Sequence, residues 1–139
     1  MTGQVVPRPK TRGKTPTAAT LKRKADRLWG EYIHRRDQQC RFCGKRDGKL
    51  DAHHICIRSF AATRTDEQNG LLLCWPTCHQ NVAHGDPFRA VLLYTDILGA
   101  DAYAALRAKA QAGVKANAMH WRAEVARLTA LLSELEVTP

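Results

Sequence analysis

Two cysteine pairs on either side of a His-His step constrain this chain more than any other feature. Cys40 and Cys43 are separated by two residues, and Cys74 and Cys78 by three. Thiolates in two close pairs are typical ligands of a tetrahedral Zn2+ ion. The start of the chain lacks the apolar stretch of a signal peptide, so we expect a cytoplasmic protein whose cysteines stay reduced. The pattern therefore predicts a four-cysteine zinc site.

A zinc ion with four thiolate ligands leaves no open position for a substrate, so this site would be structural. It would tie the loop before the His-His strand to the turn after the second strand, which suits a small fold with a thin core. Reduced cysteines without metal are the alternative. Cys56 stands outside both pairs, and we expect a buried, small apolar side chain there.

Hydrophobic periodicity predicts an α+β fold in which short strands are flanked by helices. We expect strands over residues 49–57 and 70–74, with a polar, irregular loop between them. The expected helices span residues 17–36, 78–85, 87–98, 101–112 and 115–136. No run of about 18 apolar residues occurs, so the sequence predicts no membrane span.

Composition and helix signals divide the chain into three parts. Residues 1–15 mix Pro, Gly, Thr and basic residues without a hydrophobic period, which indicates a flexible basic arm. Residues 16–86 hold the expected strands and all the cysteines, and residues 87–139 form a helical extension. Asp86 followed by Pro87 is typical of a helix start, and Asp101 is expected to cap the next helix.

The last expected helix carries an apolar stripe of Trp121, Val125, Leu128, Leu132 and Leu135. Such a stripe most often packs into the core of the same chain. The alternative is a homodimer that forms through this helix.

Charge is concentrated in the first half of the chain. The net charge is +9, and residues 1–64 hold 16 Lys and Arg against 5 Asp and Glu. A basic surface of this kind favours a polyanionic partner, most often nucleic acid. Solubility alone would also explain the charge. We expect DNA as the partner, contacted by the basic side of the 17–36 helix.

The tandem histidines His53 and His54 are candidates for chemistry. Adjacent residues of a strand point to opposite faces, so one imidazole can bind a metal while the other accepts a proton. Asn69 lies just before the second strand, where its amide could tie the long loop to the backbone, although a simple turn residue is the alternative. Arg58 and Arg64 lie in that loop and could hold a phosphate by paired hydrogen bonds, unless the loop is merely solvated.

The order Asp51-Ala52-His53-His54-Ile55, then Asn69, then Cys74, Cys78 and His79 resembles the HNH endonuclease family in its zinc-knuckle form. The resemblance covers about residues 40–84. It implies the ββα-metal fold, in which two antiparallel strands and a helix surround one divalent cation. The residues that follow resemble phage-type members, some of which act in recombination as the Rap-type nucleases do. For a phage protein, the expected location is the host-cell cytoplasm.

The resemblance implies a role for each matching residue. His54 would be the general base and Asn69 the residue that orients the loop. His53, His79 and His84 would bind Mg2+ or another divalent cation, and the protein would cut DNA with little sequence preference.

The chain departs from the family in its spacing. The second cysteine pair is one residue wider than usual, and His79 and His84 are five residues apart instead of four. On an α-helix, five residues separate side chains by about 140°. His84 can therefore reach the cation only if the helix ends or bulges before it. Otherwise water or Asp51 would fill that position.

Two functions remain open on the sequence alone. The first is a metal-dependent endonuclease that hydrolyses DNA phosphodiester bonds. The alternative is a non-catalytic zinc module that binds nucleic acid, which leaves the tandem histidines, Asn69 and His79 unexplained.

Overall fold

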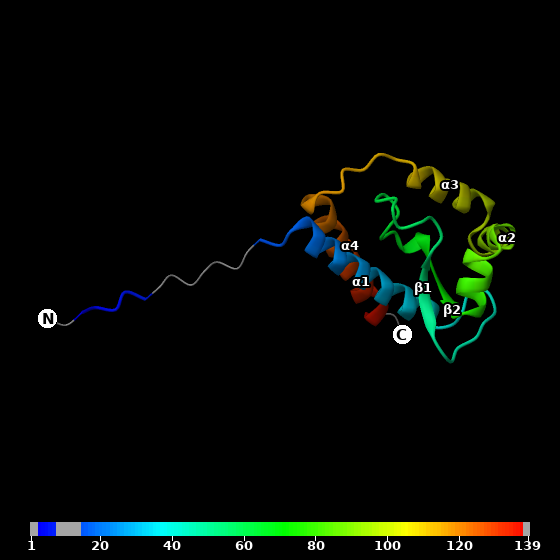
Figure 1. The fold of residues 1–139 in the computed structure, drawn as a ribbon, viewed down its shortest axis with the longest axis horizontal. Coiled ribbons are helices and arrows are strands. Elements are labelled where there is room, and N and C mark those ends of the chain that lie inside the picture. The colour runs from blue at the N-terminus through cyan, green and yellow to red at the C-terminus, as the bar shows by residue number, and fades with distance from the viewer. Residues whose placement is uncertain (1–2, 8–14, 138–139) are drawn as a thin grey trace.

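A computed structural model describes residues 3–7 and 15–137 of the chain (Figure 1). The basic arm expected over residues 1–15 lies largely outside this range, and its flexibility stays a prediction. The described residues combine helices with one small sheet, which confirms the α+β class. No helix within the described residues is long and apolar enough to cross a membrane.

The sheet consists of strand β1 (Leu50–His54) and strand β2 (Gly70–Cys74), paired antiparallel with Leu50 opposite Cys74 and His54 opposite Gly70. A short 3-10 helix, η1 (Glu67–Asn69), precedes β2, and a π-helix, η2 (Thr77–His84), follows it. β1 is shorter than expected because the chain turns away after His54. Cys56 is consequently half-buried beyond the strand end, and the expectation of a buried strand residue was wrong.

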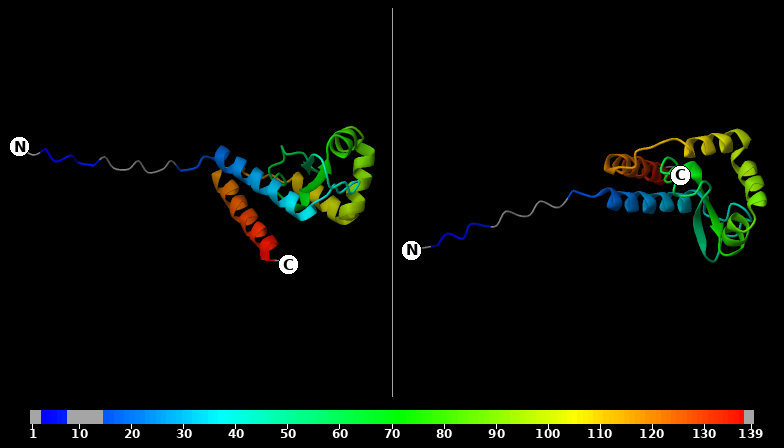
Figure 2. Two further views of the ribbon diagram at one scale, coloured as in Figure 1. Left: turned by 90° about the horizontal axis from the view of Figure 1, so that it is seen from below. Right: turned by 45° about the horizontal axis from the view of Figure 1, so that its top comes forward.

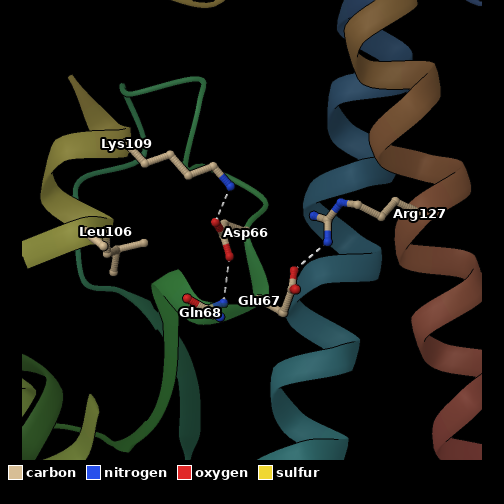
Figure 3. Close-up of a pocket in the computed structure, with 7 residues that line it drawn as sticks. Asp66, Glu67, Gln68, Leu106, Lys109 and Arg127 are labelled. Atoms are coloured by element: carbon tan, nitrogen blue, oxygen red, sulfur yellow. Dashed lines mark hydrogen bonds and ion pairs between the residues drawn. The ribbon is translucent and has the colours of Figure 1, made fainter. Parts of the chain in front are cut away.

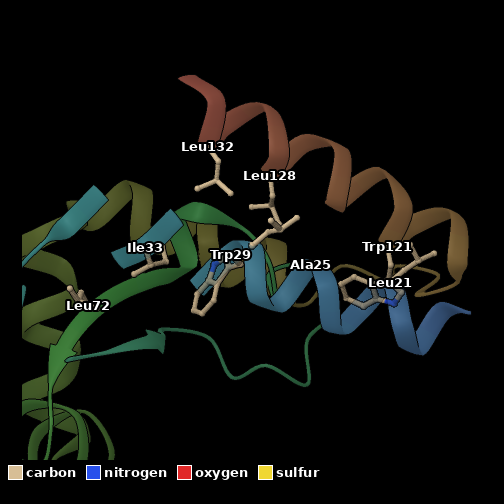
Figure 4. Close-up of a cluster of buried hydrophobic side chains, with 9 residues drawn as sticks. Leu21, Ala25, Trp29, Ile33, Leu72, Trp121, Leu128 and Leu132 are labelled. Carbon is tan, nitrogen blue, oxygen red and sulfur yellow. The ribbon is translucent and has the colours of Figure 1, made fainter. Parts of the chain in front are cut away.

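Strand β2 is buried along its whole length because it lies between two apolar clusters. Leu72 lies beside Ile33 of helix α1 (Ala18–Asp37), as Figure 4 shows, in a cluster that helix α4 (Ala118–Val137) completes. Leu71 and Leu73 face the opposite way, into a cluster with Cys40, Cys74, Cys78, Ala90 and Tyr94. The strand therefore joins the helical half of the core to the half that holds the cysteines.

Helices α1 and α4 pack against each other (Figure 2). Trp121, Leu128 and Leu132 of α4 are buried against α1, so the apolar stripe of the last helix belongs to the core of its own chain. The face that the sequence offered for a homodimer is thus already covered, and the oligomeric state stays a prediction.

Helices α2 (Pro87–Leu98) and α3 (Ala100–Ala110) follow η2. Asp86 caps α2 as expected, since its side chain accepts a hydrogen bond from the Arg89 amide. The expected cap at Asp101 was wrong, because α3 already begins at Ala100 and Asp101 lies in its first turn. Helix α4 begins three residues later than expected, where the Asn117 side chain accepts from the His120 amide.

Asp37 joins the end of α1 to the sheet. Its side chain is 1% exposed and accepts hydrogen bonds from the Leu72 amide at 2.9 Å, Arg36 at 2.7 Å and Arg41 at 3.0 Å. Burial alone would raise the pKa of Asp37, but these hydrogen bonds outweigh it and lower the pKa below its ordinary value.

We predict that the Asp37 carboxylate makes the free energy of unfolding depend on pH in the acidic range. A carboxyl group with a lowered pKa in the folded state stabilises the fold above its unfolded pKa of about 4, and this contribution is lost as the pH falls through the folded value. Asp37→Asn should lower the free energy of unfolding at pH 7 by about 3 kcal/mol. Urea unfolding from pH 7 to pH 3 should show wild type and variant converging below about pH 4. A constant difference at all pH values would contradict this.

Gly70 permits the close approach of α1 to the sheet. A Cβ atom at this position would lie 2.5 Å from Ile33 Cδ1 and 2.6 Å from Trp29 Cζ2, and both side chains are buried. We predict that Gly70→Ala lowers the free energy of unfolding by about 1–3 kcal/mol through overpacking. Gly30→Ala is the control. A Cβ there meets nothing within 4 Å, so this change should stabilise α1 by up to about 1 kcal/mol. Denaturant melts of both variants test the pair.

Candidate functional site

The four paired cysteines gather at one point, as the sequence predicts. Their sulfur atoms all lie within 4.8 Å of one another, and the Sγ atoms of Cys43 and Cys74 are 3.7 Å apart. A tetrahedral Zn2+ with bonds of about 2.3 Å separates its sulfur ligands by about 3.8 Å. The donor set and its spacing therefore fit a structural metal site.

Local backbone geometry brings these sulfurs together. The Cys40 amide donates to the Lys45 carbonyl, and the Gly44 amide to the Cys40 carbonyl, both at 2.8 Å. Gly44 has a φ of +81°, a conformation that glycine adopts without strain. Cys74 ends β2, and Cys78 lies in the first turn of η2.

The cysteines differ in their electrostatics. Burial would raise the pKa of Cys40, but hydrogen bonds from the amides of Cys43, Cys74 and Phe42 lower it to about 7. Burial and the neighbouring sulfurs raise the pKa of Cys78 far above its ordinary value. Without a cation, the cluster therefore cannot hold four thiolates, because a buried group of like charges is unfavourable.

A second group of candidate ligands comprises His53, His79 and His84. Their ring nitrogens lie within 4.8 Å of one another, and the ring centroids are 5.0–5.2 Å apart. His53 is buried and His84 is exposed, so the group is open to solvent on one side.

The π-helix explains how two histidines five residues apart meet. A π-helix hydrogen-bonds residues i and i+5, so its turn takes about one residue more than an α-helical turn. The Asn81 amide donates to the Pro76 carbonyl at 3.1 Å in this pattern. His79 and His84 consequently face the same side of η2. On the sequence alone, His84 could reach the cation only if the helix ended or bulged before it, and the π-helix is such a bulge.

Hydrogen bonds orient two of the three imidazoles. Nδ1 of His79 lies 3.1 Å from the Asp51 carboxylate, which leaves Nε2 as its free nitrogen. Nε2 of His53 lies 2.6 Å from the Tyr94 hydroxyl, which leaves Nδ1. Partners of this kind fix the tautomer and ring orientation of histidine ligands. Asp51 thus supports His79, and Tyr94, on α2, is a residue that the sequence analysis missed.

The charge state of His53 also suits a metal ligand. Burial, and then the neighbouring imidazoles of His79, His84 and His54, lower the pKa of His53 to about 3. The ring is therefore neutral at neutral pH, which metal binding requires.

His54 occupies the other side of the strand. Its ring stacks on Trp29 with centroids 4.0 Å apart and an angle of 12° between the planes. Its Nε2 lies 2.9 Å from the Arg64 carbonyl oxygen. A carbonyl can only accept, so Nε2 carries the proton and Nδ1 keeps its lone pair. Burial lowers the pKa of His54 and favours this neutral form.

Asn69 ties the loop to the strands, as expected. Its side chain is fully buried, accepts from the Cys56 amide at 2.6 Å, and donates to the carbonyls of Cys56 at 3.0 Å and Thr63 at 2.9 Å. The amide therefore joins both ends of the loop and positions it without touching the cleft.

The side chains of the two loop arginines lie in different surroundings. Arg58 is exposed and lines the cleft beside the histidines. The Arg64 guanidinium instead pairs with Asp26 of α1 through two contacts of 2.8 Å. Asp26 therefore occupies two donors of this guanidinium, and the phosphate clamp expected at Arg64 stays a prediction. Arg64 contributes its backbone carbonyl to His54.

These groups line one cleft of about 490 Å3, formed by Ala52, His53, His54, Ile57, Arg58, His79 and His84. Another hollow of about 330 Å3 lies between η1, α3 and α4 (Figure 3). Its charged side chains neutralise one another, since Lys109 pairs with Asp66 and Arg127 with Glu67. The first cleft therefore gathers the groups suited to chemistry, and the second braces the loop.

Comparison with protein-family models, curated proteins and solved structures finds no match to this chain.

We predict that the purified protein holds one tightly bound zinc ion per chain. Cys40→Ser should lose the metal and most of the stability, because structural zinc contributes on the order of 10 kcal/mol in small domains. Cys56→Ser is the matched control, since Cys56 lies outside the cluster and should leave zinc content unchanged. Metal analysis and thermal melts of both variants measure this. Full zinc content in Cys40→Ser would contradict the assignment.

Proposed function

We propose that the protein is a metal-dependent endonuclease of the HNH type, built on a ββα-metal core. The observation that carries the proposal is the convergence, in one cleft, of three histidines suited to a cation with a fourth histidine whose Nδ1 is free. A zinc module that only binds nucleic acid has no use for this arrangement. The antiparallel strands followed by a helix also agree with the fold that the sequence resemblance implies.

In this mechanism, Nδ1 of His54 accepts the proton of the attacking water. The Arg64 carbonyl keeps the opposite nitrogen protonated, and Trp29 holds the plane of the ring. A neutral imidazole with a fixed tautomer is a suitable general base. His54 can therefore activate water without rearrangement of its own hydrogen bonds.

Arg58 supplies positive charge at the rim of the cleft. Its side chain is exposed where it lines the cleft, so its guanidinium can donate to oxygens of the phosphate. Held by His53, His79 and His84, a divalent cation would stabilise the charge that develops on the phosphate and the leaving oxygen.

The donor set bears on the identity of that cation. Imidazole nitrogens suit Zn2+, Ni2+ and other first-row metals, whereas Mg2+ prefers oxygen ligands. We therefore expect Ni2+ to support activity at least as well as the Mg2+ that the resemblance implies.

DNA is the proposed substrate. Arg23, Lys24 and Arg27 of α1 are exposed, and the first half of the chain carries the excess positive charge. Such a surface attracts the phosphate backbone without reading sequence.

A plasmid assay tests the proposal. Supercoiled DNA should be nicked in the presence of Mg2+, Mn2+ or Ni2+ and left intact in excess EDTA. His54→Ala should reduce the rate at least about 100-fold, because general-base catalysis contributes 10²–10⁴-fold. His34→Ala is the matched control, since His34 is exposed on α1 outside the cleft, and its rate should be unchanged.

Two outcomes would overturn the proposal. One is equal cleavage by His54→Ala and the parent protein. The other is no cleavage by a zinc-loaded, DNA-binding parent with any metal, on plasmid or on branched and single-stranded DNA. The second outcome would favour the zinc module that binds without cutting.

A further inference from the structure

An ion pair joins helix α1 to the loop beside the candidate base. Nε and Nη2 of Arg64 donate to the two carboxylate oxygens of Asp26, each at 2.8 Å. The third donor of the guanidinium, Nη1, donates to the Arg58 carbonyl at 3.0 Å. The Arg64 side chain is 15% exposed and that of Asp26 is 31% exposed, so this pair is partly screened from water. Two-point geometry and partial burial make such a pair both strong and directional.

We propose that Asp26 is a positioning residue for His54, which acts through the Arg64 side chain on the peptide group that receives the imidazole Nε2–H. The inference rests on the proposed function, because it concerns the base of that reaction. Neither the resemblance nor the sequence pattern assigns a role to Asp26.

The contacts form a continuous path. Asp26 fixes the guanidinium of Arg64, and the backbone of Arg64 carries the carbonyl that lies 2.9 Å from His54 Nε2. The loop around Arg64 has no sheet or α-helix to hold it. Turn hydrogen bonds, such as that from the Arg64 amide to the Phe60 carbonyl at 3.0 Å, and side-chain contacts together set its orientation. Loss of the ion pair would let this peptide group move. The Nε2–H tautomer of His54 would then no longer be fixed.

Two residues of helix α1 restrain the orientation of the His54 ring. Trp29, one turn after Asp26, stacks on the His54 ring and donates from Nε1 to the Asp66 carbonyl at 2.8 Å. Trp29 thus limits the tilt of the ring plane, while the Asp26–Arg64 pair limits rotation within that plane. Both residues lie on the face of α1 that meets the loop.

The same pair also steadies the phosphate-binding edge of the cleft. The Arg58 carbonyl accepts from Arg64, so the backbone that carries the exposed Arg58 side chain is tied to Asp26 as well. One ion pair therefore sets the relative position of the base and the group that would hold the phosphate.

The test compares Asp26→Asn with Glu31→Gln, which removes another acid of α1 that forms an ion pair with an arginine. Glu31 pairs with Arg35 on the exposed side of the helix and does not touch the loop. Imidazole 15N NMR of the zinc-loaded protein reports the tautomer of His54 directly, without any need for activity. We expect a single Nε2–H tautomer in wild type and in Glu31→Gln, and a mixture in Asp26→Asn.

Kinetics provide the second readout. Asp26→Asn should lower kcat about 10- to 100-fold while KM for DNA stays within about twofold, because small displacements of a catalytic group cost this much. Because the acceptor of His54 is a backbone atom, the side chain at position 64 can be exchanged. The double variant Asp26→Arg with Arg64→Asp should restore the tautomer and most of kcat, which a general loss of stability would not do.

The outcomes separate the two proposals. An unchanged His54 tautomer in Asp26→Asn overturns the positioning role, whatever the nuclease result. A changed tautomer that the exchanged pair restores supports it, even if the parent protein cuts no DNA and the proposed function fails. An unchanged kcat in Asp26→Asn, with an active parent, also overturns it.

Discussion

Burial of the second half of the segment between the two strands is the constraint on which most of the structure depends. Residues 55–69 contain only one short 3-10 turn, yet Thr63, Thr65, Asp66 and Asn69 are buried. Peptide groups without a partner are costly inside a protein, so this segment needs donors and acceptors from elsewhere. Asn69 supplies them from within the segment, Trp29 from α1, and Arg127 from α4 through its bond to the Thr65 carbonyl. The candidate base depends on this bracing, because its hydrogen-bond partner is one of these peptide groups.

The features that the sequence predicted well are those that depend on neighbours along the chain. The cysteine pairs, the cap at Asp86 and the loop-tying amide of Asn69 follow from residue type and local spacing. The contacts of Arg64, Asp26 and Tyr94 could not be predicted, because no spacing pattern indicates which residue, tens of positions away, each of them meets. An arginine in a polar loop gives no sign of whether its donors face solvent or an acid on a distant helix. The buried loop itself was also missed, since its residues are polar and lack a hydrophobic period.

Neighbouring residues serve the two candidate metal centres. Cys78 belongs to the sulfur cluster, and His79, the next residue of η2, belongs to the histidine cluster. On the sheet, Cys74 of β2 pairs with Leu50 of β1, three residues before His53. The sulfur cluster thus fixes one end of both elements that carry the histidines. A cation at the structural centre would therefore contribute to the geometry of the cleft as well as to folding.

The π-helix can also be regarded as an insertion. One residue added to a turn of α-helix between two ligands would ordinarily move the second ligand to another face, but a wider turn absorbs the added residue locally. The ends of η2 then keep their places, with Cys78 in the cysteine-lined core and Gly85 before α2. Helix type and ligand spacing can therefore change together while the pair of imidazoles is preserved. The spacing of ligands along such a chain is consequently a less strict criterion for a metal site than the arrangement of those ligands in space.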